Sequence, residues 1–168
     1  MATQTEPQAD AQALAGQYLT FVLAEESYGL EILKVREIIQ MCKITPVPRT
    51  PDYIEGVINL RGKVIPIVDL RSRFDLPRQE RTEQTCIIVV HLDGVETGLI
   101  VDQVSEVIDI AAGEIDEAPE MGTGADTEYI LGMGKQQEKV TILLDIAKAL
   151  NGGELAELAV DSSGRSED

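Results

Sequence analysis

The residue best suited to recognising another molecule is Arg61, in the segment Asn59-Leu60-Arg61-Gly62. A guanidinium group can hold a carboxylate through two parallel hydrogen bonds, which fix orientation and add affinity. The alternative interpretation is a solvated surface arginine, whose ion pairs contribute under about 1 kcal/mol to stability. We favour a binding role, because the matching position in a second copy of this segment holds Gln137.

Four carboxylates stand at matching places in the two copies, Glu37 with Glu106 and Asp69 with Asp145. Acid–base catalysis by two carboxylates needs them within a few ångströms of each other, and nothing in the sequence brings any two so close. Asp69 and Asp145 each follow an apolar run at the junction of a strand and a turn. Aspartates at such junctions commonly accept hydrogen bonds from nearby backbone amides, so we predict that both are structural caps.

The residue types that ligate metals are scarce. Cys42 and Cys86 lie far apart without CxxC spacing, and His91 is the single histidine, so a standard zinc site is not expected. Both cysteines have apolar neighbours and are predicted to be small buried hydrophobic residues. The Gly-rich segments lack the Lys-Ser/Thr context of a phosphate-binding loop. We therefore expect no metal and no cofactor.

The chain contains two diverged copies of a unit of roughly 70 residues, and such repeats decide a fold. The matching segments are 53–70 with 129–146, at an offset of 76 residues, and 29–39 with 98–108, at an offset of 69 residues. A residue type kept in both copies is better explained by the fold, whereas a group present once, such as Arg61, is a better candidate for function. The paired glycines Gly56 and Gly132 are predicted to allow close approach of another backbone segment.

The composition excludes several classes of partner. The protein has 168 residues, enough for one ordinary domain or two small ones, and a formal net charge of -16. This charge repels phosphate groups, so neither a nucleic acid nor direct membrane insertion is expected. We find no signal peptide and no apolar run of membrane-spanning length, which predicts a cytoplasmic protein.

Short apolar runs separated by turn signals predict a mainly β fold. Strands are expected at 17–23, 64–68, 86–92 and 140–144, with a turn at 24–29, a short helical turn followed by a strand at 30–39, and a short helix at 145–150. The dipeptide Asp93-Gly94 between two apolar runs predicts a hairpin. Each unit has the length of a five-stranded barrel, so the duplication predicts two tandem barrels with a groove between them.

We place the first barrel unit at 17–82 and the second at 83–152. A disordered N-terminal tail, 1–16, and an acidic C-terminal tail, 153–168, are expected to flank them. The sequence leaves open whether strands exchange between the two barrels.

Three blocks of sequence carry a resemblance to a known family. They are Tyr28–Ile38, Gly56–Gly62 and Ile65–Leu70, and Gly98–Val107 extends the match. With these blocks the chain resembles the CheW family from about Gln17 to Leu150. The resemblance implies two SH3-like five-stranded β-barrels and an adaptor that is not an enzyme.

The resemblance also places the Asn59–Gly62 turn beside a receptor-binding groove. There Arg61 is expected to form a salt bridge with Glu37, and valines are expected to supply an apolar wall. Each valine alone is better explained as barrel core, and only the set marks the groove wall by analogy with the family. The expected groove residues are Val35, Glu37, Arg61, Gly62, Val101, Val104 and Val107.

The family further implies a function and partners. It couples the helical hairpin tips of chemoreceptors, the methyl-accepting chemotaxis proteins, to the regulatory domain of the histidine kinase CheA in signalling arrays at the inner face of the membrane. We expect this chain to do the same and to be a monomer outside the array. The alternatives are a scaffold of the same fold in another chemosensory-type pathway and a small-molecule-binding β-barrel.

Overall fold

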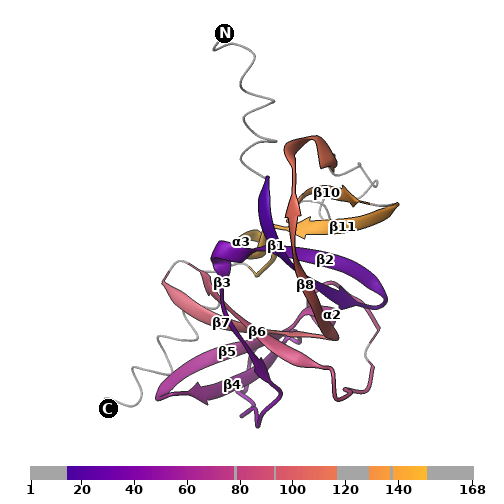
Figure 1. Ribbon diagram of the computed structural model, residues 1–168. Helices are drawn as coiled ribbons and strands as arrows, with labels where there is room; N and C mark the ends of the chain where they lie inside the picture. Colours follow the sequence, from indigo (N-terminus) through magenta and orange to yellow (C-terminus); the bar gives the residue numbers. More distant parts are fainter. Residues whose placement is uncertain (1–14, 78, 93, 117–128, 137, 151–168) are drawn as a thin grey trace.

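The computed structural model is mainly β, and its strands form two sheets (Figure 1). The structure describes residues 15–77, 79–92, 94–116, 129–136 and 138–150. The six-stranded sheet has the order β8-β1-β2-β11-β10-β9, and the five-stranded sheet has the order β3-β6-β7-β5-β4. The mainly β class is therefore confirmed, and the two sheets are consistent with two SH3-like barrels.

The elements of the first copy are β1 (Gly16–Leu23), β2 (Glu26–Glu31), the 3₁₀ turn η2 (Ile32–Lys34), β3 (Val35–Gln40), β4 (Ile54–Leu60), β5 (Lys63–Asp69) and α2 (Leu70–Arg73). Those of the second copy are β6 (Cys86–Leu92), β7 (Val95–Val101), β8 (Gln103–Ile110), the 3₁₀ turn η3 (Ala112–Glu114), β9 (Ile115–Asp116), β10 (Ile130–Gln136), β11 (Lys139–Leu144) and α3 (Ile146–Leu150). The helical turn followed by a strand, expected at 30–39, is confirmed by η2 and β3.

Neither sheet is built from one copy of the repeat. Strands β1 and β2 join β8, β9, β10 and β11, whereas β6 and β7 join β3, β4 and β5. Four strand pairs join the copies: β1 with β8 and β3 with β6 are antiparallel, and β2 with β11 and β5 with β7 are parallel. The strand exchange that the sequence left open thus takes place. The ranges 17–82 and 83–152 delimit the repeated unit and not the sheets; residues 1–14 and 151–168, most of the two expected tails, lie outside the described residues.

Each sheet curls until its two ends meet. After β3, the amide of Thr45 donates to the carbonyl of Val57 in β4 at 2.8 Å, and the amide of Val57 returns a bond of 2.9 Å. In the other sheet the side-chain amide of Gln136 in β10 donates to the carbonyl of Asp109 in β8 at 2.6 Å. We call the two closed units the five-stranded barrel and the six-stranded barrel.

Three apolar clusters fill the protein. The five-stranded barrel encloses Ile58, Ile65, Ile67, Ile87, Val89 and Ile100. The six-stranded barrel encloses Tyr18, Ile110 and Leu143. The largest cluster, here called the central core, takes residues from both sheets together with Leu70 of α2 and three residues of α3, which are Ile146, Ala149 and Leu150. Both short helices therefore close the space between the barrels.

The turn expected at 24–29 is wrong in extent. Only Ala24 and Glu25 form the loop of the β1–β2 hairpin, with φ of 51° and 71°, and β2 begins at Glu26. Two left-handed residues are typical of a type I′ hairpin, which usually uses Asn or Gly. Here the amide of Ala24 donates to Oδ2 of Asp102 at 2.9 Å, a tertiary contact that no local sequence signal reveals.

The cysteine prediction also needs correction. Cys42 is exposed and Cys86 is only partly buried, and both thiols are free. Cys42 follows β3 between Met41 and Ile44, which pack against the core of the five-stranded barrel, so apolar neighbours in sequence do not guarantee burial.

An ion pair ties the two barrels together at the junction of β7 and β8. The guanidinium of Arg71 in α2 donates from Nε to Oδ1 of Asp102 at 2.8 Å and from Nη2 to Oδ2 at 2.6 Å. The Arg71 side chain is 11% exposed and the Asp102 side chain 29%. Burial by itself raises the pKa of Asp102, but the hydrogen bonds from Arg71 and Ala24 and the charge of Arg71 lower it overall. The folded state therefore favours the carboxylate.

Asp102→Asn should destabilise the protein by about 3 kcal/mol at neutral pH, because the nearly buried charge of Arg71 loses the carboxylate with which it forms an ion pair. Since folding lowers the pKa of Asp102, its contribution is present above the ordinary value of 3.8 and is lost as the pH falls below it. Urea unfolding at neutral and acid pH measures this effect. Asp116→Asn, which removes the exposed pair with Lys135, is the control. Equal losses for the two variants, or a loss independent of pH, would contradict this account.

Gly56 adopts φ of +147°, and an added Cβ would lie 2.1 Å from the carbonyl oxygen of Thr45. At Gly132 the corresponding distance is 2.9 Å, to the carbonyl oxygen of Asp116. We predict that Gly56→Ala destabilises the protein by about 3 kcal/mol, because both the backbone conformation and the Thr45–Val57 contact are disturbed. Gly113→Ala, with nothing within 4 Å, should change unfolding by under about 0.5 kcal/mol. A small effect at Gly56 in thermal unfolding would refute the close approach.

Candidate functional site

Arg61 stands in the two-residue loop of the β4–β5 hairpin. Arg61 and Gly62 have φ of 52° and 87°, which is the left-handed pair of a type I′ turn. The amide of Gly62 donates to Oδ1 of Asn59 at 2.8 Å and fixes the loop. The Arg61 side chain is 68% exposed. The turn thus presents a guanidinium group at the surface from a rigid base.

Arg61 and Glu37 are brought together. Nη2 of Arg61 donates to Oε2 of Glu37, which lies on β3 and keeps 31% of its side chain exposed. Because β3 and β4 are the end strands of the five-stranded sheet, this ion pair spans the seam where the barrel closes. It leaves the other guanidinium nitrogens of Arg61 available at the surface.

The valines of the expected groove have three different environments. Val35 and Val104 are partly buried and pack against the central core from β3 and β8, which are equivalent strands of the two copies. Val107 is 47% exposed. Val101 has no exposed surface, so its expected place in the groove wall is corrected to the central core. It ends β7, a strand with neighbours on both sides.

Two exposed apolar residues were missed by the sequence analysis. Ile38 on β3 is 44% exposed and occupies the position equivalent to Val107 on β8. Leu33, in η2, is 93% exposed. The period-two alternation of side chains in a strand is the signal that could have found Ile38, because it places Val35 and Glu37 on one face of β3 and Ile38 on the other.

Strand β8 reaches across to the other barrel at Cys86, the first residue of β6. Burial raises the pKa of the Cys86 thiol, and a hydrogen bond with the backbone of Val104 offsets part of this rise. This hydrogen bond connects β8 of the six-stranded barrel directly to β6 of the five-stranded barrel.

Asp69 and Asp145 both precede a helix. Oδ1 of Asp69 accepts from the amide of Arg71 at 3.0 Å, and Oδ1 of Asp145 accepts from the amide of Lys148 at 3.3 Å. The two carboxylates therefore satisfy backbone amides at the beginnings of α2 and α3. Gln137, the counterpart of Arg61, lies outside the described residues.

Arg71 and Asp102 are further residues that the sequence analysis missed. A signal for them existed, because each is present in only one copy of the repeat: the counterpart of Arg71 is Ala147, and that of Asp102 is Leu33. The same argument that selected Arg61 also selects this pair, whose role is to join the barrels.

Within the described part of the chain, no group of three or more His, Cys, Asp or Glu side chains could hold a metal ion. No helix among the described residues is long and apolar enough to cross a membrane.

The fold and the side chains together define a double-barrel β protein whose distinctive charged and apolar groups lie on its surface. A family model described as the CheW-like domain matches residues 17–154. The chain belongs to the CheW family.

Comparison with individual proteins agrees. The chemotaxis protein CheW of Klebsiella aerogenes is 40% identical over 145 residues, which cover 86% of this chain and 87% of that protein. The chemotaxis protein CheW of Bacillus subtilis is 38% identical over 143 residues, covering 84% and 90%. A solved structure, the scaffolding protein TtCheW from Thermoanaerobacter tengcongensis, matches with a TM-score of 0.72 and 41% identity over 78% of this chain and 89% of that one.

Arg61→Asn should leave stability within about 1 kcal/mol of the parent protein. An exposed ion pair contributes little, and Asn accepts the left-handed backbone of the turn better than Arg does. Urea unfolding measures the difference, with Arg61→Val as the comparison, because a β-branched residue is strained at positive φ. A loss as large for Asn as for Val would show that the guanidinium itself holds the fold.

Proposed function

We propose that this protein is an adaptor that couples the cytoplasmic tips of chemoreceptors to the regulatory domain of the histidine kinase CheA. Its membership of the CheW family, whose relatives are named chemotaxis proteins and a scaffolding protein, is the observation that carries the proposal. The adaptor acts by holding two partners in one complex, without chemistry of its own. We expect it in the cytoplasm, at receptor arrays on the inner face of the membrane.

The surface around Glu37 and Arg61 supports a receptor contact. A helical hairpin tip offers apolar side chains and carboxylates, and Arg61 can hold a carboxylate while Val107 supplies an exposed apolar side chain. The Glu37 carboxylate orients the guanidinium before the partner arrives, which reduces the entropy lost on binding. Val35 and Val104, partly buried beneath, keep this surface rigid.

The kinase contact belongs on a different surface. The regulatory domain of CheA has the same two-barrel fold by the family resemblance, and two such proteins can meet through exposed barrel ends. Val64 and Val140 occupy equivalent positions in the two copies and are 40% and 52% exposed. We place the kinase at the end that carries Val140, because Val64 lies in the same β4–β5 hairpin as Arg61. The two partners can then bind together.

Arg61→Asn separates the two contacts. It should weaken binding of a receptor hairpin fragment about tenfold, equivalent to about 1.4 kcal/mol, and leave binding of the CheA regulatory domain unchanged. Calorimetry with each purified partner measures both affinities. Lys135→Asn removes the same charge from an exposed ion pair on β10 and serves as the matched control.

Equal receptor affinity for the Arg61 and Lys135 variants would contradict the proposal that Arg61 contacts the receptor, but it would not contradict the adaptor role. Absence of binding between the parent protein and every CheA-type kinase of the same organism would overturn the adaptor role itself. Binding only to a kinase that serves another chemosensory output would assign the protein to that pathway.

A further inference from the structure

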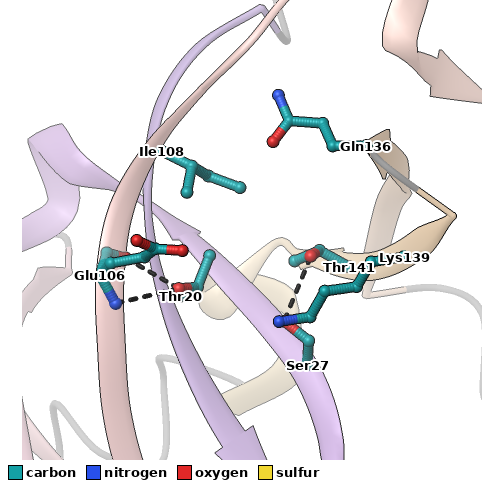
Figure 2. A pocket seen from close by; sticks show the side chains of 7 residues that line it. All are labelled: Thr20, Ser27, Glu106, Ile108, Gln136, Lys139 and Thr141. Carbon is teal, nitrogen blue, oxygen red and sulfur yellow. Dashed lines mark hydrogen bonds between the residues drawn. The ribbon is translucent and has the colours of Figure 1, made fainter.

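The six-stranded barrel contains a polar cavity of about 320 Å³ (Figure 2). Three hydroxyl residues form its inner wall, Thr20, Ser27 and Thr141, and they are only 3%, 8% and 5% exposed. Glu106 on β8 and Lys139 on β11 enter the cavity from opposite sides, and Ile108 and Gln136 complete the lining. The volume is at the small end of the about 300–1,000 Å³ that ligand pockets occupy.

The equivalent positions of the five-stranded barrel are largely apolar. The repeat offsets and the strand registers pair Thr20 with Val89 and Thr141 with Ile65, and both Val89 and Ile65 are buried in that barrel's core. The two barrels are built from equivalent strands in matching registers, so a packed apolar interior is compatible with this fold. The cavity in the six-stranded barrel is therefore a feature of this copy and not a requirement of the architecture.

The charges show the same contrast at the Lys139 side. In the five-stranded barrel, Nζ of Lys63 lies 3.5 Å from Oε1 of Glu96. Lys139 is the counterpart of Lys63, but Ser27 replaces Glu96, with the same hairpin register in both copies. Within the described part of the chain, no carboxylate pairs with Lys139. The six-stranded barrel therefore has the equivalent lysine but not the carboxylate that pairs with it in the five-stranded barrel.

On the Glu106 side, the carboxylate is present and its cationic partner is missing. In the five-stranded barrel, Glu37 is paired with Arg61. Its counterpart Glu106 bonds to Thr20 only through backbone atoms, the amide donating at 3.1 Å and the carbonyl accepting at 2.8 Å. The residue that matches Arg61 in sequence is the neutral Gln137. No cation pairs with the Glu106 carboxylate among the described residues.

We propose that this cavity binds a small zwitterion that carries one ammonium and one carboxylate group, as amino acids do. The carboxylate takes the place that Glu96 fills in the other barrel, against Lys139 and the hydroxyls of Ser27 and Thr141. The ammonium takes the place of the Arg61 charge, against Glu106. The ligand supplies both of the charges that this copy lacks and joins β8 to β2 and β11.

The expected affinity for the zwitterion depends on how exposed the residues that bind it are. Glu106 and Lys139 are exposed, so ion pairs with them contribute only weakly to affinity. The buried hydroxyls of Ser27 and Thr141 add neutral hydrogen bonds of modest strength. The sum corresponds to binding in the millimolar range.

Glycine, β-alanine and γ-aminobutyrate are suitable probes, because they separate the two charges by increasing distances. In a titration followed by NMR, at least one should shift the methyl signals of Thr20, Thr141 and Ile108 with a millimolar dissociation constant. Acetate and methylammonium, each carrying one of the two groups, should bind at least about tenfold more weakly. Failure of all three probes overturns the proposal, as does acetate binding equal to theirs.

Two variants locate the site. Ser27→Glu supplies the missing carboxylate from the chain and should reduce probe affinity at least about tenfold. Lys139→Gln, at an exposed position that leaves the fold intact, should do the same. Lys63→Gln makes the matched change in the five-stranded barrel and should have no effect. Unaltered probe binding in the Lys139 variant, or equal losses in the Lys63 variant, refutes the site; because the readout needs neither kinase nor receptor, this test is independent of the adaptor role.

Discussion

Four strand pairs between the two copies, β1 with β8, β2 with β11, β3 with β6 and β5 with β7, hold this molecule together. Buried backbone groups must find hydrogen-bond partners, and in each pair the partner strand comes from the other copy of the repeat. The central core must then form where the two sheets meet, and the Arg71–Asp102 pair lies at that junction. One copy alone could complete its sheets only with a second chain, as domain-swapped dimers do.

The shared frame has allowed the two copies to diverge in chemistry. In the five-stranded barrel, Glu37 forms an ion pair with Arg61 and Glu96 forms one with Lys63, so each carboxylate has a partner from the same barrel. The six-stranded barrel keeps one acid and one base without these partners and replaces core side chains with hydroxyls. The duplication therefore allows the two copies to be compared within one protein. Residue types present in both copies are explained by the fold, and residue types present in one copy are candidates for a separate role.

Much of the fold could be predicted because short β-branched runs and turn signals are local properties, and the repeat showed that they occur twice. The strand exchange could not, because β1 and β6 have similar apolar patterns and either could pair with β3 or β8. The positive φ at Ala24 depends on a tertiary bond to Asp102. Val101 was misplaced because a valine pattern does not distinguish a core position from a surface one, whereas Arg61 was identifiable from its turn.

The positions of the aromatic rings give the protein a built-in optical probe. It has no Trp, four Tyr and two Phe. Phe21, Tyr28, Phe74 and Tyr129 stack in series through the central core, with centroid separations of 5.9, 6.0 and 5.0 Å. Among the described residues, the core of the five-stranded barrel contains no aromatic ring. Tyrosine fluorescence and near-ultraviolet circular dichroism therefore report mainly on packing in the central core, with a further contribution from Tyr18 inside the six-stranded barrel. They carry no direct signal from the core of the five-stranded barrel.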